Sequence, residues 1–276
     1  MTVSELANFP PWEWPESAAE EIKRTLRDRR NVGRLTAAEL GGDLVVMDDE
    51  MADLLSSIVQ DSSEPDELRE RAAISLAPVL EQCWVEGYEY EDGLTDPPIE
   101  EATYNRLRET LRRVHEDARA PKGVRRMALE AAIRAEEDWL ADAVRKAYSR
   151  PDDEWKLTAV FCMRYLEGFE KEIMESLRSP NPDIHREAVR SAGQRGLDAA
   201  WPHIKALLSS GKTPKPLLLA AIEAAGGMHN AEASGMLAEF TESADEDIVD
   251  AADDALTEAN SAQEDWDEDE EDDEEA

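Results

Sequence analysis

The apolar positions of this chain repeat along its length with helical spacing. In the stretch 181–196, which reads NPDIHREAVRSAGQRG, Ile184, Ala188 and Ala192 lie four residues apart and therefore share one face of a helix. A proline and a carboxylate precede this face, as is typical of a helix start, and Gly196 follows it as a stop signal. The stretch predicts one helix with a narrow apolar face.

The same template occurs six times. Aligned on Ile184, the copies begin at Leu68, Val124, Trp155, Ile184, Pro216 and Ile248, at intervals of 56, 31, 29, 32 and 32 residues. The residue four places further on is alanine in every copy: Ala72, Ala128, Ala159, Ala188, Ala220 and Ala252. A small side chain lets a neighbouring helix approach closely, and such a period is typical of solenoids, whose units bury their apolar faces against each other. The pattern predicts an all-α, right-handed α-solenoid of about six antiparallel helix pairs.

Turn signals separate these pairs, among them the stretches SRPDD, SPNPD and SADED. The predicted pairs are residues 43–60 or 48–60 with 65–80, 99–117 with 121–135, 138–149 with 152–166, 169–178 with 182–195, 198–209 with 214–225, and 231–243 with 245–259. The longest interval contains an insertion, residues 84–98, whose glycines, prolines and acids predict a loop. Because loops on rigid scaffolds often carry function, this loop is a candidate contact surface.

Both ends of the chain differ from the repeats. Prolines in the lead-in, residues 1–16, exclude a regular helix and place Phe9, Trp12 and Trp14 on an extended segment. These rings either fold back onto the first helix pair or form an exposed docking peptide. The predicted parts are this Pro/Trp-rich lead-in, an N-terminal capping helix in residues 17–42, the solenoid in 43–259, and a disordered acidic tail in 260–276. The tail is too rich in acids to bury a core.

Charge and cysteine usage restrict the compartment and the partners. The chain has 65 Asp and Glu against 30 Lys and Arg, a formal net charge of −35, which opposes nucleic acid and anionic membranes and favours basic partners. The plainer interpretation is a solvated surface suited to a salty cytoplasm. Two isolated cysteines form no disulfide framework, and the chain shows neither signal-peptide features nor an apolar run long enough for a membrane span. We expect a cytoplasmic monomer.

Three stretches resemble the second helices of HEAT repeats: PDELRERAAISL, PDDEWKLTAVFCM and NPDIHREAVRSAG. The spacing is closest to the short HEAT-like repeats of the phycobilin lyases, and the resemblance covers about residues 43–259. It implies an α-solenoid, and a ladder between repeats made by the aspartate before each second helix and the base that follows its first apolar residue. Asp66 with Arg69 and Asp153 with Lys156 match this pattern, whereas the last two copies lack the base.

Catalytic and metal-binding motifs are not found. No GxSxG, GxxxxGK[ST], GxGxxG or HExxH occurs, and the four histidines show no ligand spacing. The deoxyhypusine hydroxylases, which are HEAT-repeat enzymes, bind iron through several His-Glu dyads, whereas this chain has one, His115-Glu116. We therefore predict no catalytic residue, no metal and no cofactor, and expect that the chain is not an enzyme.

A binding surface follows from the repeat register. If the alanine face points inward, the opposite side of the second helices offers arginines and apolar groups, a composition typical of protein-binding centres. The candidate partner-binding residues are Arg126, Phe161, Arg164, Arg186 and Arg190, with Leu157, Leu218 and Ile222 beside them and Trp84, Tyr88 and Tyr90 from the insertion. A second candidate is a basic island between Arg106 and Arg134, which includes Arg106, Arg112, Arg113 and Arg125. Contacts of these groups within the chain are the structural alternative.

The predicted function is a non-enzymatic scaffold that binds a protein or peptide, including a basic one, on the concave face of the solenoid. Two alternatives remain: a HEAT-like enzyme of the chromophore-lyase or DNA-glycosylase type, and a binder of basic partners in which the acidic tail competes for the basic island or for the partner.

Overall fold

The computed structural model describes residues 1–88, 97–228 and 230–259, apart from the side chain of residue 231. Within these ranges the regular structure is helical and no strand occurs, so the all-α class is confirmed, and the arrangement of helix pairs is that of an α-solenoid. Tyr90 and the predicted disordered tail at 260–276 lie outside the described residues. The helices fall into two compact units, Met1–Ala143 (unit 1) and Val144–Ala276 (unit 2). Among the residues that the structure describes, no helix has both the length and the apolar composition needed to cross a membrane.

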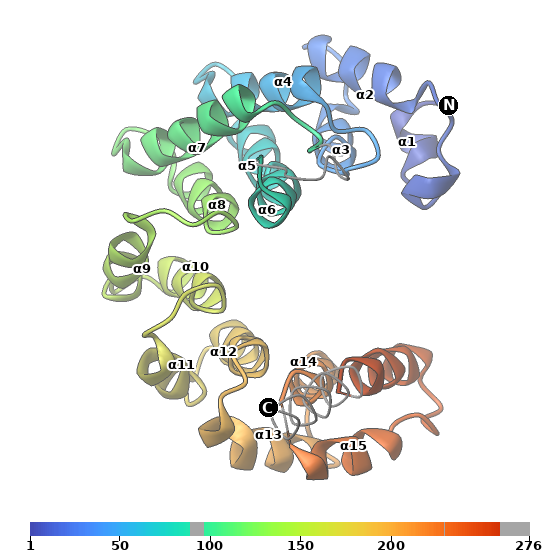
Figure 1. Ribbon diagram of the computed structural model, residues 1–276, viewed down its shortest axis with the longest axis vertical. Coiled ribbons are helices and arrows are strands. Elements are labelled where there is room, and N and C mark those ends of the chain that lie inside the picture. The colour runs from blue at the N-terminus through green and yellow to red at the C-terminus, as the bar shows by residue number, and fades with distance from the viewer. Residues whose placement is uncertain (89–96, 229, 260–276) are drawn as a thin grey trace, which may run out of the picture. The chain divides into compact units, whose positions relative to one another are not determined.

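Unit 1 opens with short helices and continues with two stacked helix pairs (Figure 1). Its elements are α1 (Val3–Leu6), η1 (Pro11–Glu13), α2 (Ala18–Arg27), α3 (Arg34–Leu40), α4 (Asp49–Gln60), α5 (Asp66–Ile74), α6 (Ala77–Glu86), α7 (Glu101–Glu116) and α8 (Lys122–Ala132). Helix α4 pairs with α5 and α7 pairs with α8, while α4 also packs on α7 and α5 on α8. The second helices of successive pairs therefore stack on each other, as the repeat predicts.

Unit 2 continues the same scheme. Its elements are α10 (Asp153–Met163), α11 (Glu170–Ser176), α12 (Pro182–Gln194), η2 (Asp198–Ala200), α13 (Trp201–Leu208), α14 (Lys215–Gly226), α15 (Ala231–Ala238) and a last helix at residues 246–259; α9 (Leu140–Tyr148) spans the boundary between the units. Helices α10, α12 and α14 stack in succession, and α11 and α13 each pack on the second helix that follows them.

The predicted alanine positions lie at the tight crossings. All six alanines are fully buried, with 0% of their surface exposed: Ala72, Ala128, Ala159, Ala188, Ala220 and Ala252. Close approach extends to Gly193 on α12, where an added Cβ would lie 2.3 Å from the Cα of Ala224 on α14. The Ser191 hydroxyl also donates to the Val160 carbonyl oxygen, 2.9 Å away on α10. The prediction that small residues mark the stacked faces is thus confirmed.

Side-chain caps start the second helices where the sequence indicates. The Asp152 carboxylate accepts from the backbone N–H groups of Glu154 and Trp155 at 3.0 and 3.2 Å, and the Asn181 side chain accepts from Asp183 N–H at 3.0 Å. Gly196, with a φ of 55°, ends the α12 segment in the left-handed region that glycine adopts without strain. These caps fix the start and end of the repeat used above for the alignment.

Three boundaries differ from the sequence-based expectations. The predicted helix 65–80 is broken after Ile74, because the ring of Pro78 would clash with the carbonyl four residues earlier in a continuous helix. Helix α6 then runs to Glu86, so the first residues of the predicted 84–98 loop are helical. The C-cap of this helix is Gly87, whose φ is 72°. In the predicted capping region, residues 17–42, α2 and α3 form in place of one helix.

The lead-in also differs from the predicted extended segment. A capping box between Thr2 and Glu5 opens α1 ahead of the prolines, and η1 holds Pro11–Glu13 in a 3₁₀ turn. The Trp14 ring nitrogen donates to the carbonyl oxygens of Leu6 and Phe9, each at 3.0 Å, so Trp14 folds back onto the chain. Trp12, in contrast, is 80% exposed.

Candidate functional site

Most arginines of the basic island of unit 1 pair with acids, some of which come from other helices. The pairs are Arg106 with Asp53 (3.1 Å), Arg108 with Glu137 (2.7 Å), Arg112 with Glu116 (3.3 Å), Arg119 with Asp117 (3.1 Å) and Arg134 with Glu81 (2.5 Å). Arg113 donates to the Gln60 side-chain oxygen at 2.7 Å, and Arg125 donates to the His115 carbonyl oxygen at 2.8 Å. Since Asp53, Glu81 and Glu137 lie outside the sequence window, part of the positive charge predicted there is offset in the fold.

Two of the arginines predicted on the binding face of unit 2, Arg164 and Arg190, form ion pairs between successive repeats. Arg164, the C-cap residue of α10, pairs with Glu187 on α12, and its guanidinium lies over the Phe161 ring at 4.8 Å from the centroid. Arg190 on α12 pairs with Glu223 on α14 at 2.8 Å. The chain therefore uses these groups in its own packing, as the structural alternative supposes, and partner binding by them stays a prediction.

The remaining predicted residues of this face differ in exposure and contacts. Arg186 pairs with Asp183 within α12 at 2.8 Å, and the Arg126 side chain is half-buried and has an interaction partner in the chain. Ile222 is fully buried although an exposed position was expected, because most positions of α14 are apolar and its register does not single out a solvent face. Leu157 and Leu218 are half-buried.

The ladder implied by the HEAT resemblance takes a different form. Arg69 lies 3.8 Å from Asp66 within the same helix, and its Nε donates to the Val59 carbonyl oxygen at 3.0 Å. Asp153 accepts from the Asn181 side chain of the next repeat at 2.9 Å, while the Lys156 ammonium lies over the Tyr148 ring. Links between repeats are thus made by Arg–Glu and Asn–Asp pairs.

The insertion contributes one anchored and one exposed ring. The Tyr88 hydroxyl donates to the Ile99 carbonyl oxygen at 3.1 Å, and its ring packs on Tyr104 with centroids 5.6 Å apart. Burial raises the pKa of Tyr88 above its ordinary value, so this hydroxyl stays protonated and acts as a donor. Trp84 is exposed on α6, next to the exposed Val85.

An apolar cleft lies at the start of unit 1. It has a volume of about 410 Å³ and brings together three chain segments: the lead-in, the α3–α4 connection and the α5–α6 junction. Its lining consists of Ala7, Phe9, Pro11, Trp14, Glu39, Leu40, Gly42, Asp43, Ile74, Ser75 and Pro78. We call this feature the N-terminal cleft. In the lead-in Trp14 folds back onto the chain while Phe9 and Trp12 stay exposed, and the role of the lead-in as a docking peptide stays a prediction.

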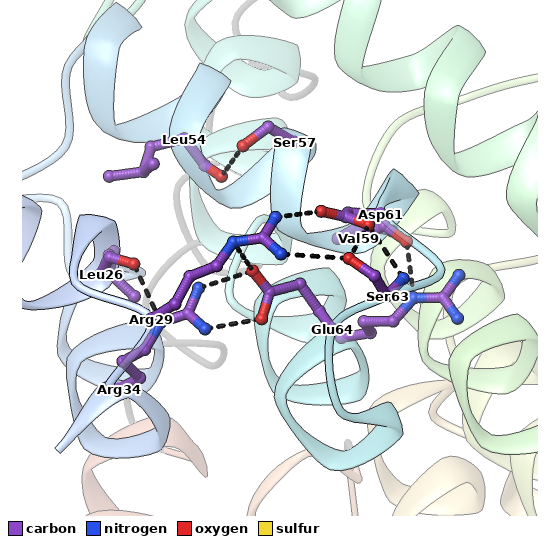
Figure 2. Close-up of polar contacts among 10 residues, drawn as sticks. Leu26, Arg29, Arg34, Leu54, Ser57, Val59, Asp61, Ser63 and Glu64 are labelled. Carbon is purple, nitrogen blue, oxygen red and sulfur yellow. Dashed lines mark hydrogen bonds and ion pairs between the residues drawn. The ribbon is translucent and has the colours of Figure 1, made fainter. Parts of the chain in front are cut away.

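An ion network, buried at Arg34 and Glu64, joins α3 to the α4–α5 turn (Figure 2). The Arg34 guanidinium donates to both carboxylate oxygens of Glu64, at 2.6 and 3.0 Å, and to the Leu26 carbonyl oxygen at 2.9 Å. Arg29 reaches Glu64 at 3.3 Å and also pairs with Asp61. Hydrogen bonds from Ser63, with the Arg29 guanidinium, lower the pKa of Asp61 to about 2, and Arg34 likewise lowers the pKa of Glu64. Sequence reasoning missed this network because its partners are thirty residues apart.

Two histidines of unit 2 share a hydrogen bond between ring nitrogens. The Nε2 atoms of His185 on α12 and His203 on α13 lie 2.8 Å apart, so one ring donates and the other accepts. Burial lowers the pKa of both imidazoles, and for His203 the charges of His185 and Arg178 lower it further. The pair can hold one added proton on the outer nitrogen of the donor ring, but a second proton would break the bond.

This pair should make unit 2 less stable in mild acid. Because both folded pKa values lie below the unfolded value of about 6.5, the unfolded state binds more protons, and stability falls as pH decreases from that value. Each such proton contributes a slope of up to about 1.4 kcal/mol per pH unit. Urea unfolding at several pH values between 7.5 and 5.5 gives the free energy of unfolding as a function of pH. This free energy should fall less steeply with decreasing pH in the double variant His185→Gln, His203→Gln than in the parent chain. Equal slopes would contradict the assignment.

No metal cluster occurs in the described ranges, where no group of three or more His, Cys, Asp or Glu side chains converges. The two side chains of the single His-Glu dyad, His115 and Glu116, contact different residues. The His115 Nδ1 lies 3.1 Å from the Arg125 carbonyl oxygen, whereas Glu116 pairs with Arg112. The two side chains therefore have structural contacts within and between α7 and α8.

Comparisons with known proteins identify no family. Neither a family model nor a curated protein matches the chain. Among solved structures, it is similar to human deoxyhypusine hydroxylase in complex with glycerol, with 17% identity, coverage of 91% of this chain and 87% of that one, and a TM-score of 0.41. It is also similar to an engineered protein, with 15% identity, coverage of 76% and 96%, and a TM-score of 0.40. These neighbours agree with a helical repeat-type fold.

One prediction is corrected by this comparison. We expected that the chain is not an enzyme, and this expectation is contradicted, because the deoxyhypusine hydroxylase is an enzyme by its name. At this TM-score the likeness carries no argument about which reaction, substrate or residues would be involved.

Proposed function

We propose that this chain, a helical-repeat protein of the short HEAT-like type, binds a protein or peptide partner in the N-terminal cleft. The observation that supports this is the position of the exposed apolar groups. Among the described residues, the large apolar side chains that are exposed all lie between Met1 and Val85. Phe9, which is 45% exposed, lines the cleft, while Trp12 and Leu44 adjoin lining residues in the chain. An exposed aromatic and aliphatic cluster around a concave site is typical of an interaction surface.

The charges around the cleft favour a partner with basic flanks. Asp43 and Glu39 line the cleft, Glu39 also lying 3.6 Å from the Arg71 guanidinium, and the chain as a whole carries −35. Apolar anchors would supply most of the affinity, since full burial of one such side chain stabilises a complex by about 1.5–3 kcal/mol. The acids would attract Lys and Arg and raise the association rate, an effect screened beyond about 8 Å at physiological ionic strength. We therefore infer a segment with aromatic or aliphatic anchors next to basic residues.

A displayed library of random peptides, selected on the immobilised full chain, tests this proposal. We expect enriched peptides that combine an aromatic or aliphatic anchor with Lys or Arg. In the double variant Phe9→Ala, Trp12→Ala, the Kd of a synthesised peptide should rise by about tenfold or more, as for aromatic hot-spot residues. Fluorescence anisotropy measures the Kd of the peptide for the parent chain and for the variant.

Two control variants locate the site. Val32→Ser removes a fully exposed apolar side chain that does not line the cleft, and should leave the Kd unchanged. Trp84→Ala removes the exposed ring on α6, which does not line the cleft. A rise in the Kd of this variant would therefore indicate binding at the insertion instead of in the cleft. A peptide that binds the Phe9, Trp12 variant as tightly as the parent would disprove the cleft as the binding site.

A further inference from the structure

A second cavity, in unit 2, is lined by positive charges. It has a volume of about 530 Å³ and lies among α10, α11 and the turn that leads to α12. Lys156 from α10, Lys171 from α11 and Arg178 after α11 contribute to its lining, and Glu175 is the carboxylate among the lining residues. In a chain of net charge −35, a cavity with three cations and one acid is unusual.

These three cations are not neutralised by ion pairs. Lys156 lies over the Tyr148 ring, 4.7 Å from its centroid, and within the described ranges none of the three makes a salt bridge. The acid that the HEAT resemblance assigns to Lys156 is Asp153, which instead accepts a hydrogen bond from the Asn181 side chain. Arg106 in unit 1 and Arg190 on α12 differ in this respect, since acids pair with them.

The other lining groups suit a ligand that is partly polar. The hydroxyls of Tyr148 and Ser176 bond each other at 3.2 Å, and Tyr148 also donates to the Glu172 carbonyl oxygen at 3.3 Å. The Ser179 oxygen accepts from the Asn181 N–H at 3.2 Å, which leaves its own proton to be donated. Met174, Pro180 and the Tyr148 ring add apolar surface to the lining.

We propose that this cavity binds a phosphate monoester of a small organic molecule. Lys171, Arg178 and Lys156 balance a doubly charged phosphate group, and the Ser179 hydroxyl donates to one of its oxygens. The cavity is larger than a phosphate ion alone, so the organic part lies against Tyr148, Met174 and Pro180. The site is in unit 2 and is independent of the N-terminal cleft and of the function proposed for it.

Binding is tested with three probes, namely inorganic phosphate, phenyl phosphate and benzoate, by calorimetry on the full chain. We expect saturable binding of both phosphates, tighter for phenyl phosphate, with a Kd on the order of 1 mM, and weaker binding of benzoate. Amide NMR shifts on titration should concentrate at residues 171–179 and at Tyr148. In the double variant Lys171→Gln, Arg178→Gln the Kd should rise by about tenfold or more, because charge-assisted hydrogen bonds are lost.

The matched control is Arg30→Gln, Lys212→Gln, which removes two exposed positive charges away from the cavity. It should keep the parent Kd within about twofold, since distant exposed charges are largely screened. The proposal is overturned if the control weakens binding as much as the cavity variant, or if neither phosphate shows saturable binding. All four cations are exposed, so circular dichroism should confirm that both variants fold like the parent.

Discussion

Replacing Glu64 with alanine is expected to lower the free energy of unfolding of unit 1 by about 3–5 kcal/mol. The side chains of Glu64 and Arg34 are only 6% and 9% exposed, and both carboxylate oxygens accept from the Arg34 guanidinium. Removing the carboxylate leaves a buried positive charge whose remaining acceptor in this network is the Leu26 carbonyl oxygen. The penalty arises mainly from this uncompensated charge and only in part from the lost attraction.

Two further variants separate these contributions in urea unfolding followed by circular dichroism. Asp53→Ala removes the partner of Arg106 from a pair that is more than half exposed, and should cost less than about 1 kcal/mol. The double variant Arg34→Met, Glu64→Leu removes both charges and should recover most of the stability lost in Glu64→Ala. A cost below about 1 kcal/mol for Glu64→Ala would show that water reaches Arg34 and that the pair is not desolvated.

The repeat could be predicted from sequence because its causes are local. Four-residue apolar spacing, Asp and Asn caps and a stop glycine act within one helix, and the buried alanines follow from that spacing. The break between α5 and α6 also has a local cause, Pro78, whose effect the longer apolar pattern masked.

The candidate sites were harder to predict because their partners are distant in sequence. Arg106 is 53 residues from Asp53 and Arg190 is 33 residues from Glu223, so a count of charges within one window treats both arginines as unpaired. The N-terminal cleft likewise needs three segments that no local pattern connects, although the prolines and tryptophans of the lead-in marked one of them. Local signals thus gave the helices, while the pairing of charges depended on which faces the stacking brings together.

The stacking itself is tested by adding one methyl group. Gly193→Ala is expected to destabilise unit 2 by about 2–3 kcal/mol, the upper part of the range for overpacked cores. The new Cβ would lie 2.3 Å from the Cα, 2.6 Å from the Cβ and 2.7 Å from the carbonyl oxygen of Ala224. Because two of these atoms belong to the backbone of α14, no side-chain rotation can relieve the clash, and the two helices must separate.

A glycine without such a neighbour provides the matched control. Gly235 lies within α15, and an added Cβ there would meet no atom within 4 Å. Gly235→Ala should therefore stabilise the chain by up to about 1 kcal/mol, because alanine loses less backbone freedom in a helix. The same helical preference acts at Gly193, so opposite signs for the two substitutions would isolate the cost of the close approach. A stabilising Gly193→Ala would mean that α12 and α14 do not touch at this point, and that the alanines of the repeat are not required by tight crossings.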